Sequence, residues 1–154
     1  MIETRVAAPE DVDTIREMTD KLVQLYGDDF SEKRFEWGIQ RRLFDPLQKH
    51  GILIAYDTEA EDKLVGVIFA EIRVDPYGLS EGYIKNFYVI EEYRGKGIGR
   101  LLMKGSIEHF QQINIEKILI NLQEDEPAAE KAAQLYDSLG FKKKYTVLQL
   151  DLRD

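Results

Sequence analysis

The amino-acid sequence predicts an α+β fold in which one β-sheet has helices packed on both faces. Three observations lead to this prediction. Two segments near the N-terminus repeat apolar residues at the spacing of an amphipathic helix, and β-rich segments follow them. In the second half, strand-like and helical segments alternate, which is typical of β-α-β units. The chain has 154 residues, of which 44% are hydrophobic and 32% charged, so we expect a single domain over residues 1–154.

The first third of the chain is predicted to contain one strand and two helices. Residues 2–7 alternate weakly between apolar and polar side chains, which indicates a strand. Over residues 9–26 the apolar residues recur at helical spacing, and Pro9 stands near the predicted helix start, where proline is favoured. Residues 31–47 repeat apolar residues in the same way and predict a second amphipathic helix.

The middle of the chain is predicted to form an antiparallel hairpin and a further strand. Residues 51–57 and 64–74 are rich in β-branched and aromatic side chains, and the acidic residues 58–62 between them indicate a turn. A second turn is predicted at Asp75-Pro76-Tyr77-Gly78. Residues 83–90 then read as the next strand.

The last third alternates between helix and strand. Residues 98–113 predict a helix with one apolar face, and residues 115–122 predict a strand. Residues 127–139 predict a fourth helix that Gly140 ends. Residues 145–152 predict a final strand.

The cysteine and histidine content excludes several kinds of site. The chain has no cysteine, which excludes disulfides, thiolate zinc sites and a cysteine nucleophile. Its two histidines, His50 and His109, do not form the H-E-x-x-H pattern of zinc peptidases. Carboxylates could still bind magnesium, but no pattern in the sequence points to a metal site, and we expect none.

The charge and hydropathy of the chain indicate which classes of binding partner are expected. Lys and Arg total 21 against 29 Asp and Glu, which gives a formal net charge of −8. This charge disfavours a nucleic-acid partner and attracts a cationic substrate. No apolar run approaches the roughly 18 residues that a membrane span needs, and residues 1–5 lack the pattern of a secretory signal. We therefore expect a cytoplasmic protein without a membrane partner.

A glycine-rich turn lies where the strand at residues 83–90 gives way to the following helix. Glycines permit unusual backbone angles and close approach to a ligand, and a helix N-terminus presents unpaired N–H groups at the positive end of its dipole. Basic side chains flank these glycines. This combination predicts a site for a pyrophosphate. The glycines and basic residues of the turn are Arg94, Gly95, Lys96, Gly97, Gly99 and Arg100.

Two better-known glycine patterns do not fit this turn. A dinucleotide-binding fingerprint would need glycine at position 100 or 102, where Arg100 and Leu102 stand. A Walker-type loop would need Ser or Thr after a Gly-Lys pair, but Gly97 follows Lys96.

Instead, Arg94-x-x-Gly97-x-Gly99 resembles the coenzyme A pyrophosphate loop of the GNAT family, the GCN-five-related N-acetyltransferases. The segment from Ala132 to Phe141 is similar to the family's late helix, in which a tyrosine precedes a Gly-Phe pair. Residues 64–141 carry the resemblance. It implies a GNAT-type mixed, mostly antiparallel sheet in which the strands at residues 83–90 and 115–122 splay apart.

The resemblance also implies a donor, acetyl-CoA, and the residues that bind it. The loop, Arg94, Gly95, Lys96, Gly97, Ile98, Gly99 and Arg100, would hold the pyrophosphate. The backbone of Tyr88, Val89 and Ile90 would pair with the pantetheine arm, which slots into the splay because strand-edge groups there lack partners.

The implied reaction is direct transfer of the acetyl group to a primary amine within a ternary complex. A backbone amide near Val89 would stabilise the oxyanion, and Tyr136 matches the proton donor for the leaving thiolate. The general base is open: Glu81, Glu71 or Glu124 could act through a water, or the amine could arrive neutral.

The sequence departs from the family's pattern in two places. Ala129 stands where many members have an asparagine, and no acidic residue occurs from position 82 to 90, where members often carry one. The acceptor is either a small cationic, polyamine-like amine or a protein N-terminus or lysine. Lys85-Asn86 replaces the acidic pair of polyamine acetyltransferases. The alternative function is a non-catalytic module that senses acyl-CoA. Dimers are common in the family, so a homodimer is also considered.

Overall fold

The computed structural model describes residues 1–45, 51–123 and 128–153. The chain divides into two compact units, Met1–Ile120 and Asn121–Asp154. The expectation of one domain over residues 1–154 stays a prediction. In the described residues no helix is long and apolar enough to cross a membrane. The same residues contain no group of three or more His, Asp or Glu that could hold a metal ion.

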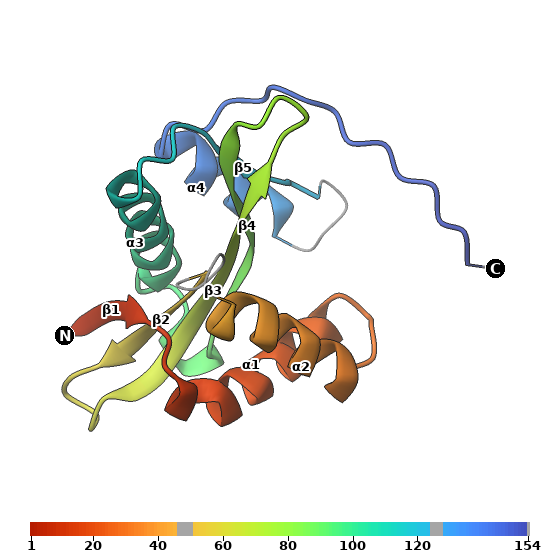
Figure 1. Cartoon of the computed structure of the whole chain (residues 1–154). Coiled ribbons are helices and arrows are strands. Elements are labelled where there is room, and N and C mark those ends of the chain that lie inside the picture. The colour runs from red at the N-terminus through yellow and green to blue at the C-terminus, as the bar shows by residue number, and fades with distance from the viewer. Residues whose placement is uncertain (46–50, 124–127, 154) are drawn as a thin grey trace. The chain divides into compact units, whose positions relative to one another are not determined.

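A five-stranded mixed sheet forms the centre of the first unit (Figure 1). The strands lie in chain order, and each of the first four is antiparallel to its neighbour, while the fifth is parallel to the fourth. This confirms the expected α+β fold with a mixed, mostly antiparallel sheet. The strands are β1 (Ile2–Val6), β2 (Ile52–Asp57), β3 (Lys63–Val74), β4 (Ser80–Val89) and β5 (Ile118–Ile120).

Three helices cover the two faces of this sheet. A 3-10 turn, Pro9–Asp11, leads into α1 (Val12–Leu25), and α2 (Glu32–Ile39) follows on the same face (Figure 1). The opposite face is covered by α3 (Ile98–Gln112). Helices therefore lie on both faces, as the sequence predicts.

The expected helix over residues 31–47 is shorter in the structure. Ser31 caps α2, since its Oγ accepts a hydrogen bond from the Arg34 N–H at 3.3 Å. The α-helix ends at Ile39, and Gln40–Phe44 forms a π-helical turn closed by the Asp45 N–H donating to the Gln40 carbonyl at 3.0 Å. Asp45 is extended because proline follows it in the sequence. Residues 46–50 lie outside the described residues.

Apolar side chains fill the space on both sides of the sheet. On the first face, buried residues of α1 and α2 meet Val67, Phe69 and Tyr88 of the central strands. On the second face, the buried Leu102 and Phe110 of α3 pack against glycines of β3 and β4. A Cβ added to Gly82 would lie 3.0 Å from the Phe110 ring, so a larger residue here would require the ring to shift.

The pairing of β4 differs at its two edges. Its register with β3 shifts so that Phe69 faces Asn86 and Ala70 faces Ile84, which leaves Lys85 as an extra residue. Its pairing with β5 covers three residue pairs and stops at Ile84. Among the described residues no strand pairs with this edge of β4 beyond Ile84. This is the splay that the family resemblance implies.

The second unit contains α4 (Ala129–Ser138) and an extended tail. The expected strand over residues 145–152 is wrong for the described residues, because none of residues 145–153 lies in a strand. The apolar side chains of this segment are 68–90% exposed at Val147, Leu148, Leu150 and Leu152. Alternation in the sequence marks a segment able to pair, but a strand forms only where a partner accepts its backbone hydrogen bonds.

Candidate functional site

The predicted pyrophosphate loop joins the end of β4 to the start of α3. A 3-10 turn, Glu91–Tyr93, follows β4, and the chain then passes through two glycines with left-handed backbone angles. Gly95 has φ of 78° and Gly97 has φ of 79°, a region that other residues rarely adopt. A Cβ built on either glycine would meet no atom within 4 Å. The backbone angle therefore explains why glycine occurs at these two positions. The space beside them is open to a ligand.

The loop delivers the N-terminus of α3 to this open space. Gly97 is the N-cap residue, and the first helical hydrogen bond runs from the Leu101 N–H to the Gly97 carbonyl at 3.1 Å. The amides of Ile98, Gly99 and Arg100 precede that bond in the chain. These amides and the positive end of the helix dipole, with basic residues on either side, suit a phosphate.

Gly99 has a different role from the other two glycines. A Cβ at this position would lie 2.8 Å from Cε2 of Phe87, which is closer than carbon atoms can approach. The first turn of α3 therefore packs directly on the end of β4, and this contact fixes the helix N-terminus beside the strand.

Arg94 ties the loop to the strand that precedes it. Its Nε donates to the Val89 carbonyl at 2.8 Å, and its guanidinium lies 5.2 Å from the centre of the Tyr88 ring. The Ile90 N–H donates to the Val65 carbonyl at 3.0 Å. Two backbone groups of the predicted pantetheine-binding segment are thus engaged within the chain.

A contact that the sequence did not reveal anchors the 3-10 turn. The Tyr93 hydroxyl donates to Oδ2 of Asp57 at 2.8 Å, so this hydrogen bond attaches the 3-10 turn to the end of β2. This hydrogen bond lowers the pKa of Asp57 and raises the pKa of Tyr93. Asp57 and Tyr93 are 36 residues apart, and no local pattern links them.

Tyr136 lies in the second unit, at the end of α4. The helix closes with a Schellman motif, in which the Phe141 N–H donates to the Tyr136 carbonyl and the Gly140 N–H donates to the Asp137 carbonyl, both at 3.0 Å. Gly140 takes the left-handed angle, with φ of 96°. The Tyr136 and Phe141 rings meet edge to face at 6.1 Å. The spacing of the Tyr…Gly-Phe motif thus has a structural purpose, and the role of the hydroxyl stays a prediction.

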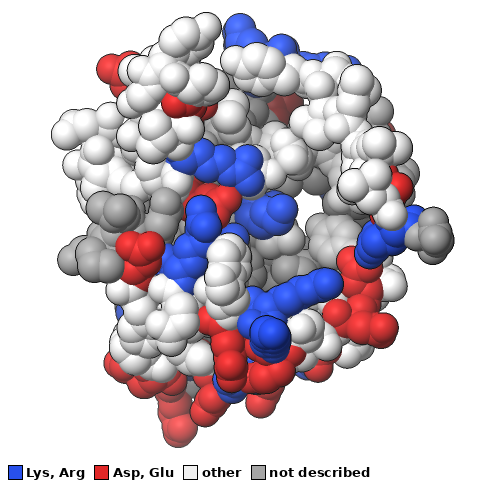
Figure 2. Space-filling view, turned by 45° about the vertical axis from the view of Figure 1, so that its right-hand side comes forward, with Lys and Arg blue, Asp and Glu red and all other residues white. Residues whose placement is uncertain are grey.

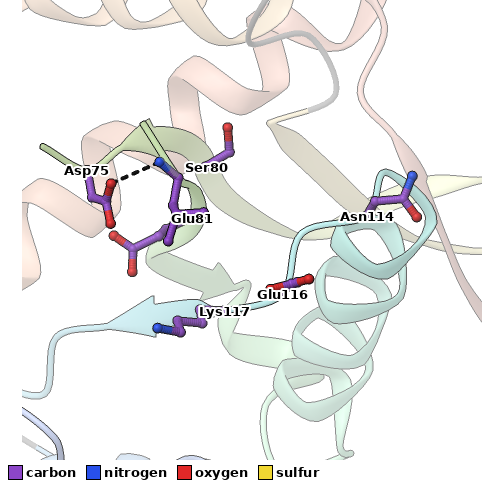
Figure 3. Close-up of a pocket in the computed structure, with 7 residues that line it drawn as sticks. Asp75, Ser80, Glu81, Asn114, Glu116 and Lys117 are labelled. Atoms are coloured by element: carbon purple, nitrogen blue, oxygen red, sulfur yellow. Dashed lines mark hydrogen bonds between the residues drawn. The ribbon is translucent and has the colours of Figure 1, made fainter. Parts of the chain in front are cut away.

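The candidate general base Glu81 does not lie near the glycine loop. Glu81 is half-buried near the start of β4, eight residues before Val89, which is roughly 25 Å along an extended strand. It lines a shallow pocket of about 200 Å³ formed by the β3–β4 turn and the segment leading into β5 (Figure 3). Asp75 shapes this turn by accepting N–H groups of Tyr77 and Leu79, both at 2.9 Å. Glu124 lies outside the described residues.

Comparison with known proteins identifies the family. A model of the acetyltransferase (GNAT) family matches residues 16–141. The chain belongs to the GNAT acetyltransferase family. The resemblance drawn from the loop is therefore confirmed, and the expectation of an N-acetyltransferase is confirmed at the level of the family.

The GNAT chain spans different fractions of the length of its individual relatives. It is 31% identical over 98 residues to a mycothiol acetyltransferase of Mycobacteroides abscessus, covering 64% of this chain and 30% of that protein. It is 26% identical over 144 residues to an uncharacterized N-acetyltransferase of Schizosaccharomyces pombe, covering 89% and 80%. Its fold matches a solved structure of the NatC complex bound to Gag peptide and CoA, with a TM-score of 0.74, 19% identity, and 94% and 86% coverage.

The GNAT chain also carries a cluster of charged residues that the sequence did not predict. Glu71 on β3 is buried, and three arginines surround its carboxylate. Arg73 Nε lies 3.0 Å from Oε1, while Arg42 Nη2 and Arg41 Nε lie 3.5 and 3.8 Å from Oε2. These four residues are called the arginine cluster below. The π-helical turn brings Arg41 and Arg42 to Glu71 from 29 or more residues away, which explains why no local pattern marked them.

The packing of Gly99 on Phe87 yields a stability prediction. Gly99→Ala should lower the free energy of unfolding by about 1–3 kcal/mol, because the added methyl group overlaps the Phe87 ring. Chemical denaturation of Gly99→Ala, Phe87→Leu and the double variant measures the coupling. The penalty of Gly99→Ala should shrink in the Phe87→Leu background. Additive effects would show that the two residues are not in contact.

Proposed function

We propose that the chain transfers an acetyl group from acetyl-CoA to a primary amine by direct attack within a ternary complex. The observation that carries this proposal is the open edge of β4, which runs straight into the glycine loop and the N-terminus of α3. One extended ligand with a pyrophosphate at one end and an amide-containing arm fits this continuous series of backbone groups. Coenzyme A has both parts, and the family membership supports it.

The two ends of the donor are bound by different chemistry. Amides of residues 97–100, with Lys96 and Arg100, would hold the pyrophosphate. The amides of the pantetheine arm would pair with backbone groups of Tyr88, Val89 and Ile90 at the β4 edge, apart from the Ile90 N–H, which donates to Val65. This pairing resembles the addition of a strand to a sheet. This orientation directs the thioester from the loop toward the bulge at Lys85.

The transfer itself needs little covalent participation by the protein. The lone pair of the neutral amine attacks the thioester carbonyl, and a backbone amide near Val89 stabilises the oxyanion. The carbon–sulfur bond then breaks, the nitrogen loses a proton, and the thiolate takes one from Tyr136. A thiol has a pKa of about 8.5 and a tyrosine about 10, so tyrosine remains protonated until the thiolate forms.

The alternatives for the general base are not equally supported. Glu81 would serve an acceptor that reaches the start of β4, since it lies roughly 25 Å along the strand from Val89. Glu71 is held by three arginines, which occupy its carboxylate oxygens. The arrangement favours an amine that arrives neutral and loses its proton to water.

Coenzyme A binding by the loop can be tested with one substitution and a matched control. Gly97→Val should weaken binding of coenzyme A at least about tenfold, because a branched side chain fills the space beside the helix N-terminus and strains a positive φ. Gly27→Val introduces the same side chain at a φ of 75° with equally open surroundings. Titration calorimetry should show normal affinity for this control. A folded Gly97→Val variant with unchanged affinity would exclude the loop as the pyrophosphate site.

The role of Tyr136 can be tested by removing its hydroxyl alone. Tyr136→Phe keeps the ring contact with Phe141, so the helix end should remain intact. We expect the rate of thiol release to fall by about 10²–10⁴ with little change in coenzyme affinity. The control is Tyr145→Phe in the same unit, where the tyrosine is 71% exposed. A Tyr136→Phe variant with nearly normal turnover would assign the residue to packing. Coenzyme binding without turnover of any amine would instead favour the acyl-CoA-sensing module.

A further inference from the structure

The charge at the arginine cluster is opposite in sign to that of the chain. The chain has a net charge of −8, yet three arginines face a single carboxylate at Glu71, which leaves two positive charges in excess. Figure 2 shows that charge is unevenly spread over the face drawn, with basic side chains gathered in its middle and acidic ones below them. Net charge is therefore a poor guide to the ligand that binds at this position.

Arg42 is the least well satisfied member of the cluster. Its side chain is 18% exposed, and its Nε is buried without a hydrogen-bond partner among the described residues. Burial lowers the pKa of Arg42, and the charges of Arg41 and Arg73 lower it further, while Glu71 opposes them. A buried, underpaired cation is unfavourable in the free protein, and a bound anion would relieve it.

The buried Tyr83 and the exposed Lys85 of β4 adjoin the cluster. The Arg73 guanidinium stacks on the Tyr83 ring, 3.5 Å from its centre, and the Lys85 Nζ lies 5.9 Å from the same ring. The Arg73 side chain is 49% exposed, and Lys85 is exposed. Stacking fixes the plane of the guanidinium, which suits two-point binding of a carboxylate or phosphate.

The basic groups of Arg73 and Lys85 that meet at the Tyr83 ring lie beside the β4 bulge toward which the donor thioester is directed. Lys85 is the extra residue of the β4 bulge, three residues before Tyr88, or roughly 10 Å along the strand. A small acceptor that placed one end against the cluster would hold its other end near the thioester. The position therefore corresponds to the acceptor rather than to coenzyme A.

We propose that the acceptor amine carries an oxyanion, most simply a carboxylate as in an amino acid, and that Arg42, Arg73 and Lys85 bind it. This inference rests on the proposed acetyl transfer and defines its substrate class. It differs from the cationic acceptor expected from net charge, because a polyamine would meet two excess positive charges at this position.

The substrate preference is tested with matched amines and acetyl-CoA. β-Alanine is compared with propylamine, and O-phosphoethanolamine with ethanolamine, while spermidine represents the cationic class. The acid-bearing member of each pair should have a kcat/KM at least about tenfold higher, and the two pairs distinguish carboxylate from phosphate. Equal rates within both pairs, or a preference for spermidine, would overturn the inference while leaving acetyl transfer established.

Variants then assign the preference to the cluster. Arg73→Gln and Lys85→Gln should each lower kcat/KM for the acid-bearing amine about tenfold and leave that for propylamine within about twofold. Lys21→Gln, on the exposed surface of α1, removes the same charge and should change neither value. A loss of equal size for both amines in Arg73→Gln would indicate a structural role and contradict the inference.

A binding measurement keeps the inference testable without turnover. N-acetyl-β-alanine, the expected product, is titrated into the protein saturated with coenzyme A and followed by calorimetry. Wild-type protein should bind it, and Arg73→Gln should bind it about tenfold more weakly. If wild-type protein binds coenzyme A but not this product, the oxyanion site is wrong. If it binds the product but releases no thiol with any amine, the proposed transfer fails and the oxyanion site stands.

Discussion

The incomplete pairing of β4 is the constraint on which the rest of the site depends. β4 is bonded to β3 along its length, but β5 leaves its other edge after Ile84. Backbone N–H and C=O groups in the middle of a fold need partners, and an edge with which none of the described strands pairs can bind an extended ligand. The bulge at Lys85 lies at the point where this edge begins. It also turns the strand, and the segment beyond it, which has no described strand at this edge, leads into the glycine loop.

The three glycines of the loop have two different roles, one in backbone conformation and one in packing. Gly95 and Gly97 allow the left-handed angles that turn the chain, while Gly99 allows α3 to rest on Phe87. The turn and the contact together fix the direction of the helix dipole. Arg94 strengthens the arrangement by bonding the Val89 carbonyl, and Tyr93 does so through Asp57. The electrostatics of the loop thus depend on a rigid junction between strand and helix.

Local signals in the sequence were sufficient for the order of elements through α4, for the glycine turn and for the end of α4. Hydrophobic periodicity, glycines and turn residues act over a few positions, so these predictions agree with the structure. Features that depend on distant partners were missed. The segment at residues 145–152 alternates like a strand but has no partner in the described residues. The arginine cluster needs a π-helical turn to meet Glu71, and no local pattern in the sequence marks this contact.

The central claim is that one extended ligand, coenzyme A, covers the open edge of β4 and the N-terminus of α3 together. Amide hydrogen exchange of the protein with and without coenzyme A tests this claim most directly, because it reports each backbone group separately. Exchange should slow both at residues 86–90 of β4 and at residues 97–100 of the loop, while β1 at the far side of the sheet should be unchanged. Slower exchange at the loop without any change in β4, or at neither segment, would contradict the account.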